Sequence, residues 1–363
     1  MVTIQYTPPV QLCFDCNSLN EADIRCSQAF PDLIHYKDRF FLTFRTAPSH
    51  FPSKHARIHV FNSADGIQWK MQHSYNGGLD VRDPHFMVFQ GKLHLFFMSH
   101  NRSLTHPGPL DIYHSMYIKG TWSKPRSLSM PKAGFWNVKA FNDHAYMSVY
   151  TYKGNNNDNK KRHLQFLRSP DLVSWETLTT SPKNEDLLSK YQTSETAFDF
   201  DEKGNIYGTI RSLIYPNLNF SFPNHRSEEW KIKVDKFKCD GPRLFTTGKE
   251  KFLIARRSLF YDLPSKPYQF LNTSRNFHKL LRYSLSRKRT AIYQFDPPTL
   301  HIKHLLDLPS HGDTGYAAVE QIEEGKFLAV YYSSDISRNK DYSWLRGQLG
   351  TTRLYTTTIT ISD

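Results

Sequence analysis

The chain has 363 residues, a formal net charge of +13 and an aromatic content of 14%, with 20 Tyr and 26 Phe. This length suits one large all-β domain or two smaller domains, and aromatic side chains favour strands over helices. No window of about 18 apolar residues occurs, which argues against a transmembrane helix, and residues 1–6 do not begin an ordinary secretory signal, so we expect a cytoplasmic location or a signal-independent export route.

Six stretches of the chain share one pattern, in which a tight charged or Gly-containing turn joins two apolar strands. The pattern recurs at intervals of roughly 45–75 residues, which is typical of a β-propeller. Because no linker rich in Pro, Gly or Ser divides the chain, we predict an all-β, six-bladed β-propeller as a single domain over residues 1–363. The predicted blade hairpins lie near residues 29–46, 81–99, 134–151, 195–212, 240–258 and 313–333.

Two turns outside these hairpins, at residues 63–69 and 169–175, have the pattern Ser-x-Asp-x-x-x-Trp. Asp65 and Asp171 can accept hydrogen bonds from amides of the turn, and Trp69 and Trp175 can fill the space between neighbouring sheets. We expect a purely structural role for them. The strand at residues 351–361 is expected to complete a blade begun at one end of the chain.

Blade five carries a basic insertion over about residues 259–289. Its positive charge is concentrated in residues 275–289. One interpretation is a solvated basic loop, and the other is contact with an anionic membrane or polymer. We expect no specific nucleic-acid partner.

Cys13, Cys16 and Cys26 lie close together in the sequence, and Cys239 stands apart. A zinc site would need a fourth ligand, and the second spacing fits no common zinc finger. Free buried thiols in a reducing compartment are therefore the expectation. We predict no metal and no cofactor.

The ends of the second strands supply one set of candidate site residues. Alignment on the final Ser or Thr of each strand puts Arg45, Arg211 and Arg257 in one column, at one rim of the fold. A guanidinium group can bind a carboxylate or sulfate through two parallel hydrogen bonds. This column therefore predicts a site for an anionic ligand.

The starts of the first strands return to the same rim. Glu195 precedes Arg211 by one hairpin, so the two side chains are expected to share that edge. Carboxylates beside arginines are expected to pair with them, and a scaffolding role is an open alternative for two of these residues, Asp32 and Asp240. The remaining candidates at these strand starts are Arg82, Asp83, Trp136, Asp313 and Tyr316.

In the motifs FPDLI, VRDPHF, SET, GPRLF and GDTGYAAV the chain resembles the sialidase superfamily of six-bladed propellers, and the resemblance covers about residues 29–361. Its Ser-x-Asp-x-x-x-Trp turns resemble the Asp-box (BNR) repeats of that family. The resemblance implies that Arg211 and Arg257 bind a substrate carboxylate. It further implies that Tyr316 attacks the anomeric carbon and that Glu195 takes the phenol proton.

The chain departs from the family pattern at two places. Ala29-Phe30-Pro31 stands where sialidases usually have Arg-Ile-Pro, and Arg45 is the expected substitute. The loop at residues 46–55 has no carboxylate where the acid/base aspartate belongs, so His50 or Asp83 is expected to transfer that proton.

Three functions follow as hypotheses. The first is a glycoside hydrolase that acts on an acidic sugar of a glycan or glycoconjugate. The second is a polysaccharide lyase that abstracts a proton from a uronate. The third is a propeller that binds glycan or protein at the same rim without catalysis.

Overall fold

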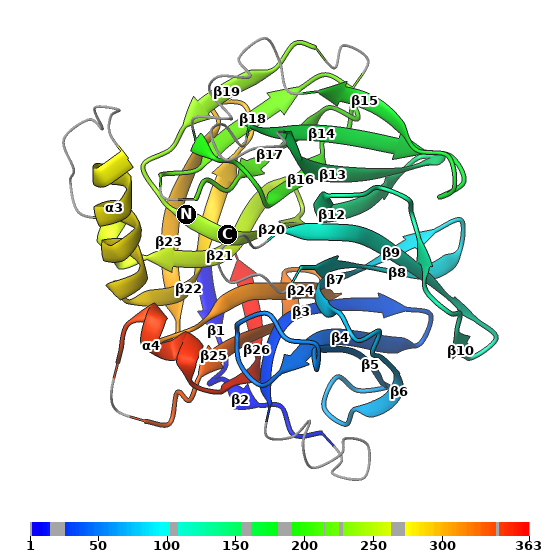
Figure 1. Cartoon of the computed structure of the whole chain (residues 1–363), viewed down its shortest axis with the longest axis horizontal. Helices are drawn as coiled ribbons and strands as arrows, with labels where there is room; N and C mark the ends of the chain where they lie inside the picture. The colour runs from blue at the N-terminus through cyan, green and yellow to red at the C-terminus, as the bar shows by residue number, and fades with distance from the viewer. Residues whose placement is uncertain are drawn as a thin grey trace.

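A computed structural model gives the structure of the chain and describes residues 2–14, 26–101, 108–153, 161–180, 191–213, 215–224, 228–262, 273–338 and 341–362. The described strands form six antiparallel sheets arranged around one axis (Figure 1). The predicted all-β, six-bladed propeller is confirmed. The first two strands of every sheet occupy the six stretches for which hairpins are predicted, while a single domain over the whole chain stays a prediction.

The strands are grouped by blade and numbered in chain order. Blade 1 contains β3 (Ser27–Tyr36), β4 (Arg39–Ala47), β5 (Arg57–Ser63) and β6 (Lys70–Tyr75); blade 2 contains β7 (Asp80–Phe89), β8 (Lys92–His100), β9 (Pro109–Ile118), β10 (Thr121–Trp122) and β11 (Arg126–Ser127); blade 3 contains β12 (Ala133–Phe141), β13 (His144–Lys153), β14 (Lys161–Ser169) and β15 (Glu176–Thr180). Blade 4 contains β16 (Thr196–Phe200), β17 (Ile206–Ile210), β18 (Leu218–Phe222) and β19 (Lys231–Val234); blade 5 contains β20 (Cys239–Thr247), β21 (Glu250–Ser258), β22 (Lys288–Asp296) and β23 (His301–Leu308); blade 6 contains β24 (Gly315–Glu323), β25 (Lys326–Ser334), β26 (Thr352–Ser362), β1 (Thr3–Tyr6) and β2 (Val10–Gln11).

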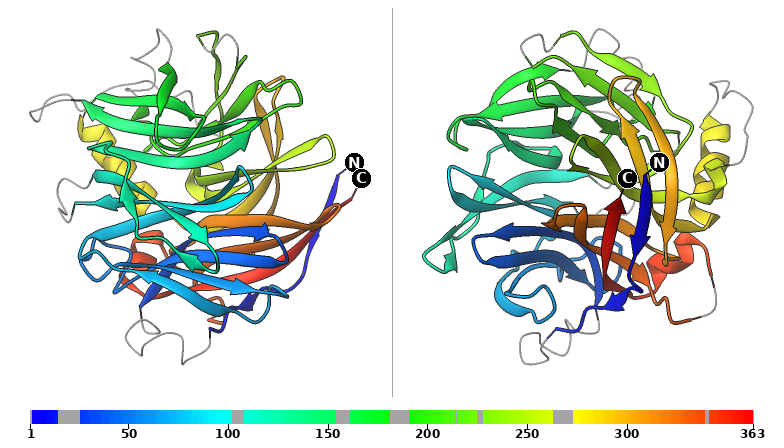
Figure 2. Two further views of the ribbon diagram at one scale, coloured as in Figure 1. Left: turned by 90° about the vertical axis from the view of Figure 1, so that its right-hand side faces the viewer. Right: turned by 180° about the vertical axis from the view of Figure 1, so that it is seen from behind.

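Blade 6 joins the two ends of the chain. β1 and β2 pair antiparallel with β26, and Thr3 lies opposite Ser362. The N- and C-terminal ends accordingly lie side by side in both views of Figure 2. The strand predicted at residues 351–361 therefore completes a blade with strands from the other end of the chain.

The first strand of each blade lines the axis. β3, β7, β12, β16, β20 and β24 each contact the first strand of the next blade, and β24 contacts β3 to close the ring. Side chains at the start of these strands consequently meet across the axis, although they are far apart in the sequence.

A β-bulge recurs near the start of the first strand. The register shifts there in five of the six blades, for example between Asp240 and Arg243 and between Gly315 and Ala318. In four of these bulges one residue has a positive φ angle: Phe30 (56°), Asp83 (48°), Gly241 (55°) and Tyr316 (50°). A bulge redirects a side chain, and a non-Gly residue in this region carries roughly 1–3 kcal/mol of backbone strain. The bulge thus gives Asp83 and Tyr316 equivalent positions in two blades.

The two Ser-x-Asp-x-x-x-Trp turns have the expected hydrogen bonds. Asp65 Oδ1 accepts from the amides of Ile67 and Gln68, each at 2.8 Å, and these bonds lower the pKa of Asp65 to about 2. Asp171 makes the equivalent bonds in its turn. Trp69 is buried against the core, as the structural interpretation requires.

The described helices lie outside the hairpins. The basic insertion contains a 3₁₀ turn (Leu259–Asp262) and α3 (Thr273–Leu285), and α4 (Trp344–Leu349) contacts α3 at one edge of the propeller (Figure 1). Residues 263–272 and the Arg275 side chain lie outside the described part. The charged groups of Lys279 and Arg282 lie over the rings of Tyr215 and Phe260 within the protein. Contact of residues 275–289 with an anionic membrane or polymer stays a prediction.

The cysteines differ in burial. Cys239 is buried, but Cys13 is exposed and Cys26 is intermediate, so the expectation of buried thiols is wrong for Cys13 because β2 and the residues after it lie at the outer edge of blade 6. Cys16 lies outside the described residues. Within the described ranges, no cluster of His, Cys, Asp or Glu could hold a metal ion, and no helix is long and apolar enough to cross a membrane.

Candidate active site

Tyr316 and Glu195 form the central hydrogen bond of the site. The Tyr316 hydroxyl donates to Glu195 Oε1 at 2.9 Å. The same oxygen accepts from Arg211 Nη1 at 2.5 Å, and Glu195 Oε2 accepts from the amide of Gly241 at 3.1 Å. Both carboxylate oxygens are engaged, so the carboxylate is held in a fixed orientation toward the phenol.

The surroundings keep Tyr316 neutral. Burial raises the pKa of the phenol and the Glu195 carboxylate raises it further, while Arg211 and Arg256 act to lower it. The pKa lies well above its ordinary value as a result. A substrate would therefore meet a neutral hydroxyl whose proton already has an acceptor.

Asp240 gathers the cations around this pair. It is fully buried, Oδ1 accepts from Arg211 Nε at 2.7 Å and contacts Lys238 Nζ, and Oδ2 accepts from the Tyr283 hydroxyl. Burial alone would raise the pKa of Asp240, but Lys238, Arg211 and Arg256 outweigh it and hold that pKa far below the ordinary value. Asp240 is therefore an anchor for arginines and does not face a ligand.

The blade-five arginine at this position is Arg256. Asp240 lies opposite Arg256 in the β20–β21 pair, whereas Arg257 lies opposite Cys239 and donates to Asp307 at 2.7 Å. The alignment that selected Arg257 is wrong by one residue, because β21 has one extra residue before its final serine. Successive side chains of a strand point to opposite faces, so this slip exchanges one face for the other.

Two aromatic side chains cover Arg256. The Trp344 ring lies 4.7 Å from the guanidinium carbon, and the Tyr283 hydroxyl lies 3.5 Å from Nη2. Asp240 lies 3.5 Å from Nε, yet Nε and Nη1 make no hydrogen bond within the described residues. Arg256 therefore keeps unused donors for an anion, in a place that solvent does not reach.

Arg45 lies inside the protein and not at the exposed rim. Its side chain is fully buried, pairs with Asp80 Oδ1 at 2.6 Å, and donates to the carbonyl oxygens of Val81, Ser49 and Phe51. The prediction that Arg45 replaces the missing family arginine is contradicted, because its donors are used inside the protein. Arg45 holds the loop between β4 and β5.

Arg82 and Asp32 occupy different depths. Arg82 is 13% exposed and donates from Nε to Asp80 Oδ2 at 2.5 Å. Asp32 is fully buried after the blade-one bulge, where Oδ1 pairs with Arg243 at 2.7 Å and Oδ2 accepts from the amide of Phe86 at 2.6 Å. Asp32 is thus enclosed and paired, which favours the scaffolding alternative for this residue, and Arg82 remains a candidate.

Asp83 lines a small hollow together with Tyr316. Burial and the Glu195 carboxylate raise the pKa of Asp83 to about 7, against the opposing effect of nearby arginines. Its Oδ1 atom has no hydrogen-bond partner within the described ranges. A carboxyl group that is partly protonated near neutral pH can donate a proton in catalysis.

Aromatic rings form the walls of this hollow. The Trp136 ring lies 5.3 Å and the Phe30 ring 5.0 Å from the Tyr316 ring, and Trp136 Nε1 donates to the Pro242 carbonyl at 2.8 Å. The hollow has a volume of about 10 Å³, which is room for roughly one water molecule. Trp136 packs against Tyr316 and is only 4% exposed.

His50 and Asp313 form a close pair beside Phe30. His50 Nδ1 lies 2.7 Å from Asp313 Oδ2, and the His50 and Phe30 rings lie 5.5 Å apart. Asp313 Oδ1 also accepts from Trp344 Nε1 at 3.0 Å and from the Tyr332 hydroxyl at 3.3 Å. Asp313, predicted as a substrate-binding residue, is occupied by these three side chains.

Sequence reasoning missed three residues of the site. Arg256 was one position from the predicted column and could have been found by aligning the bulges instead of the final serines. Tyr283 and Trp344 come from α3 and α4, which interrupt the hairpin pattern, so that pattern contains no signal for them.

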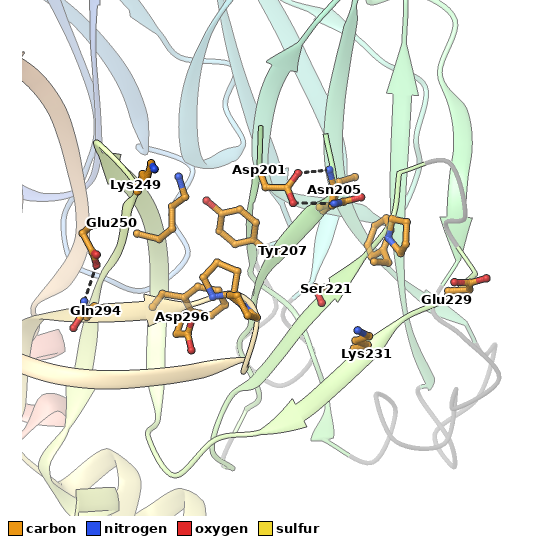
Figure 3. A pocket seen from close by; sticks show the side chains of 17 residues that line it. Asp201, Asn205, Tyr207, Ser221, Glu229, Lys231, Lys249, Glu250, Gln294 and Asp296 are labelled. Carbon is orange, nitrogen blue, oxygen red and sulfur yellow. Dashed lines mark hydrogen bonds between the residues drawn. The ribbon is translucent and has the colours of Figure 1, made fainter. Parts of the chain in front are cut away.

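A much larger cleft lies elsewhere, between blades 4 and 5 (Figure 3). Its volume is about 620 Å³, and Asp201, Tyr207, Glu250 and Gln294 are among its lining residues. The turns that border it, after Phe200 and Thr247, are at the opposite ends of the strands from Glu195 and Arg256. None of the predicted site residues lines this cleft.

The six blades arranged around one axis form a propeller of sialidase-like fold. No family model matches the chain, and no curated protein sequence matches it. The similarity of this chain to known proteins is therefore a similarity of fold, found by comparison of structures.

Three solved structures illustrate this likeness. The first is a protein of unknown function from Dyadobacter fermentans, with a TM-score of 0.69 and 14% identity over 99% of both chains. The second is Trypanosoma rangeli sialidase as a covalent intermediate with 2,3-difluorosialic acid (TM-score 0.61, 13% identity, 98% of this chain and 58% of that chain). The third is the endosialidase of phage phi92 (TM-score 0.61, 11% identity, 98% and 69%). The chain thus spans less than two thirds of the T. rangeli enzyme.

Proposed function

We propose that this chain is a glycoside hydrolase that acts on a carboxylate-bearing sugar. The observation that supports it is the 2.9 Å hydrogen bond from Tyr316 to Glu195, set between Arg211 and Arg256. The Tyr316 oxygen attacks the anomeric carbon while its proton passes to Glu195. The covalent intermediate of T. rangeli sialidase, which shares the fold, is consistent with such a two-step reaction.

Asp83 is the proton donor in this proposal. As the aglycone leaves, its oxygen takes the Asp83 proton, and a carboxyl group whose pKa is about 7 still holds that proton over much of the range below neutrality. Arg211 and Arg256 bind the sugar carboxylate, since Arg256 has unused donors. A ligand reaches Arg256 only after Trp344 or Tyr283 moves, because Arg256 is 1% exposed.

A screen of purified protein with 4-methylumbelliferyl sialosides, uronides and neutral glycosides tests the proposal. We expect release of methylumbelliferone from an acidic glycoside by the wild type and none by Tyr316→Phe. Formation of an unsaturated product that absorbs in the near ultraviolet would establish a lyase instead.

A non-catalytic, glycan-binding propeller is the second candidate. The cover over Arg256 and the 10 Å³ hollow beside Tyr316 favour it, since neither leaves room for a sugar ring in the described conformation. In that case Tyr316→Phe and the wild type would bind an acidic oligosaccharide equally well in calorimetry, and neither would turn over any glycoside.

A further inference from the structure

We propose that His50, oriented by Asp313, is the general base that activates water in the second half of the reaction, so that acid and base duties are divided between two residues. This inference rests on the proposed function and adds to it the residue that completes hydrolysis. The observation that carries it is the His50–Asp313 contact together with the buried network that fixes the His50 loop.

The loop is held on both sides of His50. The carbonyl oxygens of Ser49 and Phe51 accept hydrogen bonds from Arg45, and the Ser53 amide donates to Asp80 Oδ1 at 3.1 Å. Arg45 and Asp80 are themselves fully buried and paired. A surface loop seldom has such an anchor, and a catalytic side chain benefits from one because its position is fixed before the substrate arrives.

The proposal places the proton of the His50–Asp313 contact on His50 Nδ1. Asp313 Oδ1 accepts hydrogen bonds from Trp344 and Tyr332, which leaves Oδ2 to accept from Nδ1–H across the 2.7 Å contact. Nε2 is then the nitrogen with the lone pair. A carboxylate that holds Nδ1–H in this way orients a histidine for proton transfer at Nε2.

The charges around His50 suit a base. Burial lowers the pKa of His50, Asp313 opposes this effect, and the cations Arg82 and Arg256 lower the pKa further. His50 is therefore neutral at pH 7 and able to accept a proton. The side chain is 15% exposed and that of Asp313 only 2%, so the imidazole lies closer to the solvent from which water enters.

Attack by water releases the sugar from Tyr316. The water oxygen bonds to the anomeric carbon as the bond from that carbon to Tyr316 oxygen breaks, and the water proton passes to His50 Nε2. The departing Tyr316 oxygen takes back its proton from Glu195. His50 then loses its proton, and Asp83 regains one, by exchange with solvent.

Kinetic comparison of His50→Ala with His55→Ala tests the assignment on the acidic methylumbelliferyl glycoside that the wild type cleaves. His55 is an exposed residue of the same loop and serves as the matched control. We expect kcat to fall about 10²–10⁴-fold in His50→Ala and to remain unchanged in His55→Ala. Azide needs no base to attack, so it should restore turnover of His50→Ala and yield the glycosyl azide.

Asp313→Asn tests the positioning role. Without the carboxylate, the pKa of His50 falls, so the acid limb of the kcat–pH profile should move to lower pH while kcat decreases. ¹⁵N NMR of the wild-type protein without substrate gives a measurement that does not depend on activity. It should show the His50 proton on Nδ1. A proton on Nε2, an unshifted acid limb, or a fully active His50→Ala enzyme would each overturn the dyad while leaving the proposed function intact. A wild type that cleaves no glycoside would overturn both.

Discussion

The hydroxyl of Tyr316 lies 2.9 Å from Glu195 Oε1, although the two residues are 121 positions apart and belong to blades 6 and 4. The contact exists because the first strands of the blades meet at one axis and because a bulge turns Tyr316 to a positive φ angle of 50°. The phenol and its proton acceptor are thereby placed together before any ligand binds.

We expect Tyr316→Phe to abolish turnover and Glu195→Gln to reduce kcat about 10²–10⁴-fold, the range for loss of a positioned base. The phenylalanine ring keeps the contacts to Trp136 and Phe30, so the fold should be preserved. Steady-state kinetics with the acidic glycoside measure the loss, and near-ultraviolet circular dichroism checks the packing. Unchanged kcat in either variant would contradict the nucleophile–base assignment.

Gly241→Ala should displace the Tyr316 ring. Gly241 has a φ angle of +55°, and an added Cβ would lie 2.6 Å from Tyr316 Cγ. Gly248 has a φ of +53° with no atom within 4 Å of such a Cβ, so Gly248→Ala is the matched control for backbone strain alone. Urea denaturation should show a loss of roughly 1–2 kcal/mol for the control and a further loss of about 1–3 kcal/mol for Gly241→Ala. An equal decrease in the free energy of unfolding in both variants would show that the Tyr316 ring can move aside without destabilising the protein.

The stability of the protein should depend on Asp83 between about pH 4 and pH 7. Because the pKa of Asp83 is raised to about 7 by burial and by Glu195, the folded state keeps a proton that the unfolded state releases near its ordinary value of 3.8. The unfolded state binds fewer protons in this window, so the free energy of unfolding falls as the pH rises through it. Asp83→Asn should remove this part of the decline in urea denaturation at several pH values.

Glu320→Gln provides the control for that experiment. Burial raises the pKa of Glu320 to about 7 as well, so its substitution should flatten the same stability profile. Only Asp83→Asn should also remove the decline of kcat/KM above pH 7, since Asp83 alone of the two lines the hollow with Tyr316. Identical kinetic profiles for the two variants would exclude Asp83 as the acid.

Arg256→Lys and Arg257→Lys separate the two neighbouring arginines of blade five. Lysine keeps the charge but loses the planar fork, and a lost charge-assisted hydrogen bond is worth roughly 1.5–3 kcal/mol. We therefore expect kcat/KM to fall at least about tenfold in Arg256→Lys. Arg257→Lys should behave like the wild type, because Arg257 pairs with Asp307 away from the cluster. A larger loss of kcat/KM in Arg257→Lys than in Arg256→Lys would show that Arg257 is the ligand-binding arginine, as the alignment on the final serine predicted.

The sequence by itself determined the hairpins, the six blades and the closing strand at residues 351–361, because turn residues and strand alternation are local signals. The pairing of β26 with β1 and β2 came from the tertiary structure. The sequence also brought Glu195, Arg211 and Tyr316 to one rim. Only the tertiary structure decided to which face of its sheet each side chain points. One extra residue in β21 exchanged Arg257 for Arg256, and Arg45, at a position equivalent to a rim residue, was buried as the clamp of the His50 loop. The same limit applies to Asp313, two of whose partners, His50 and Trp344, come from a loop and a helix that follow no repeat. Contacts across the axis depend on how six sheets pack, and no spacing within one hairpin contains that information.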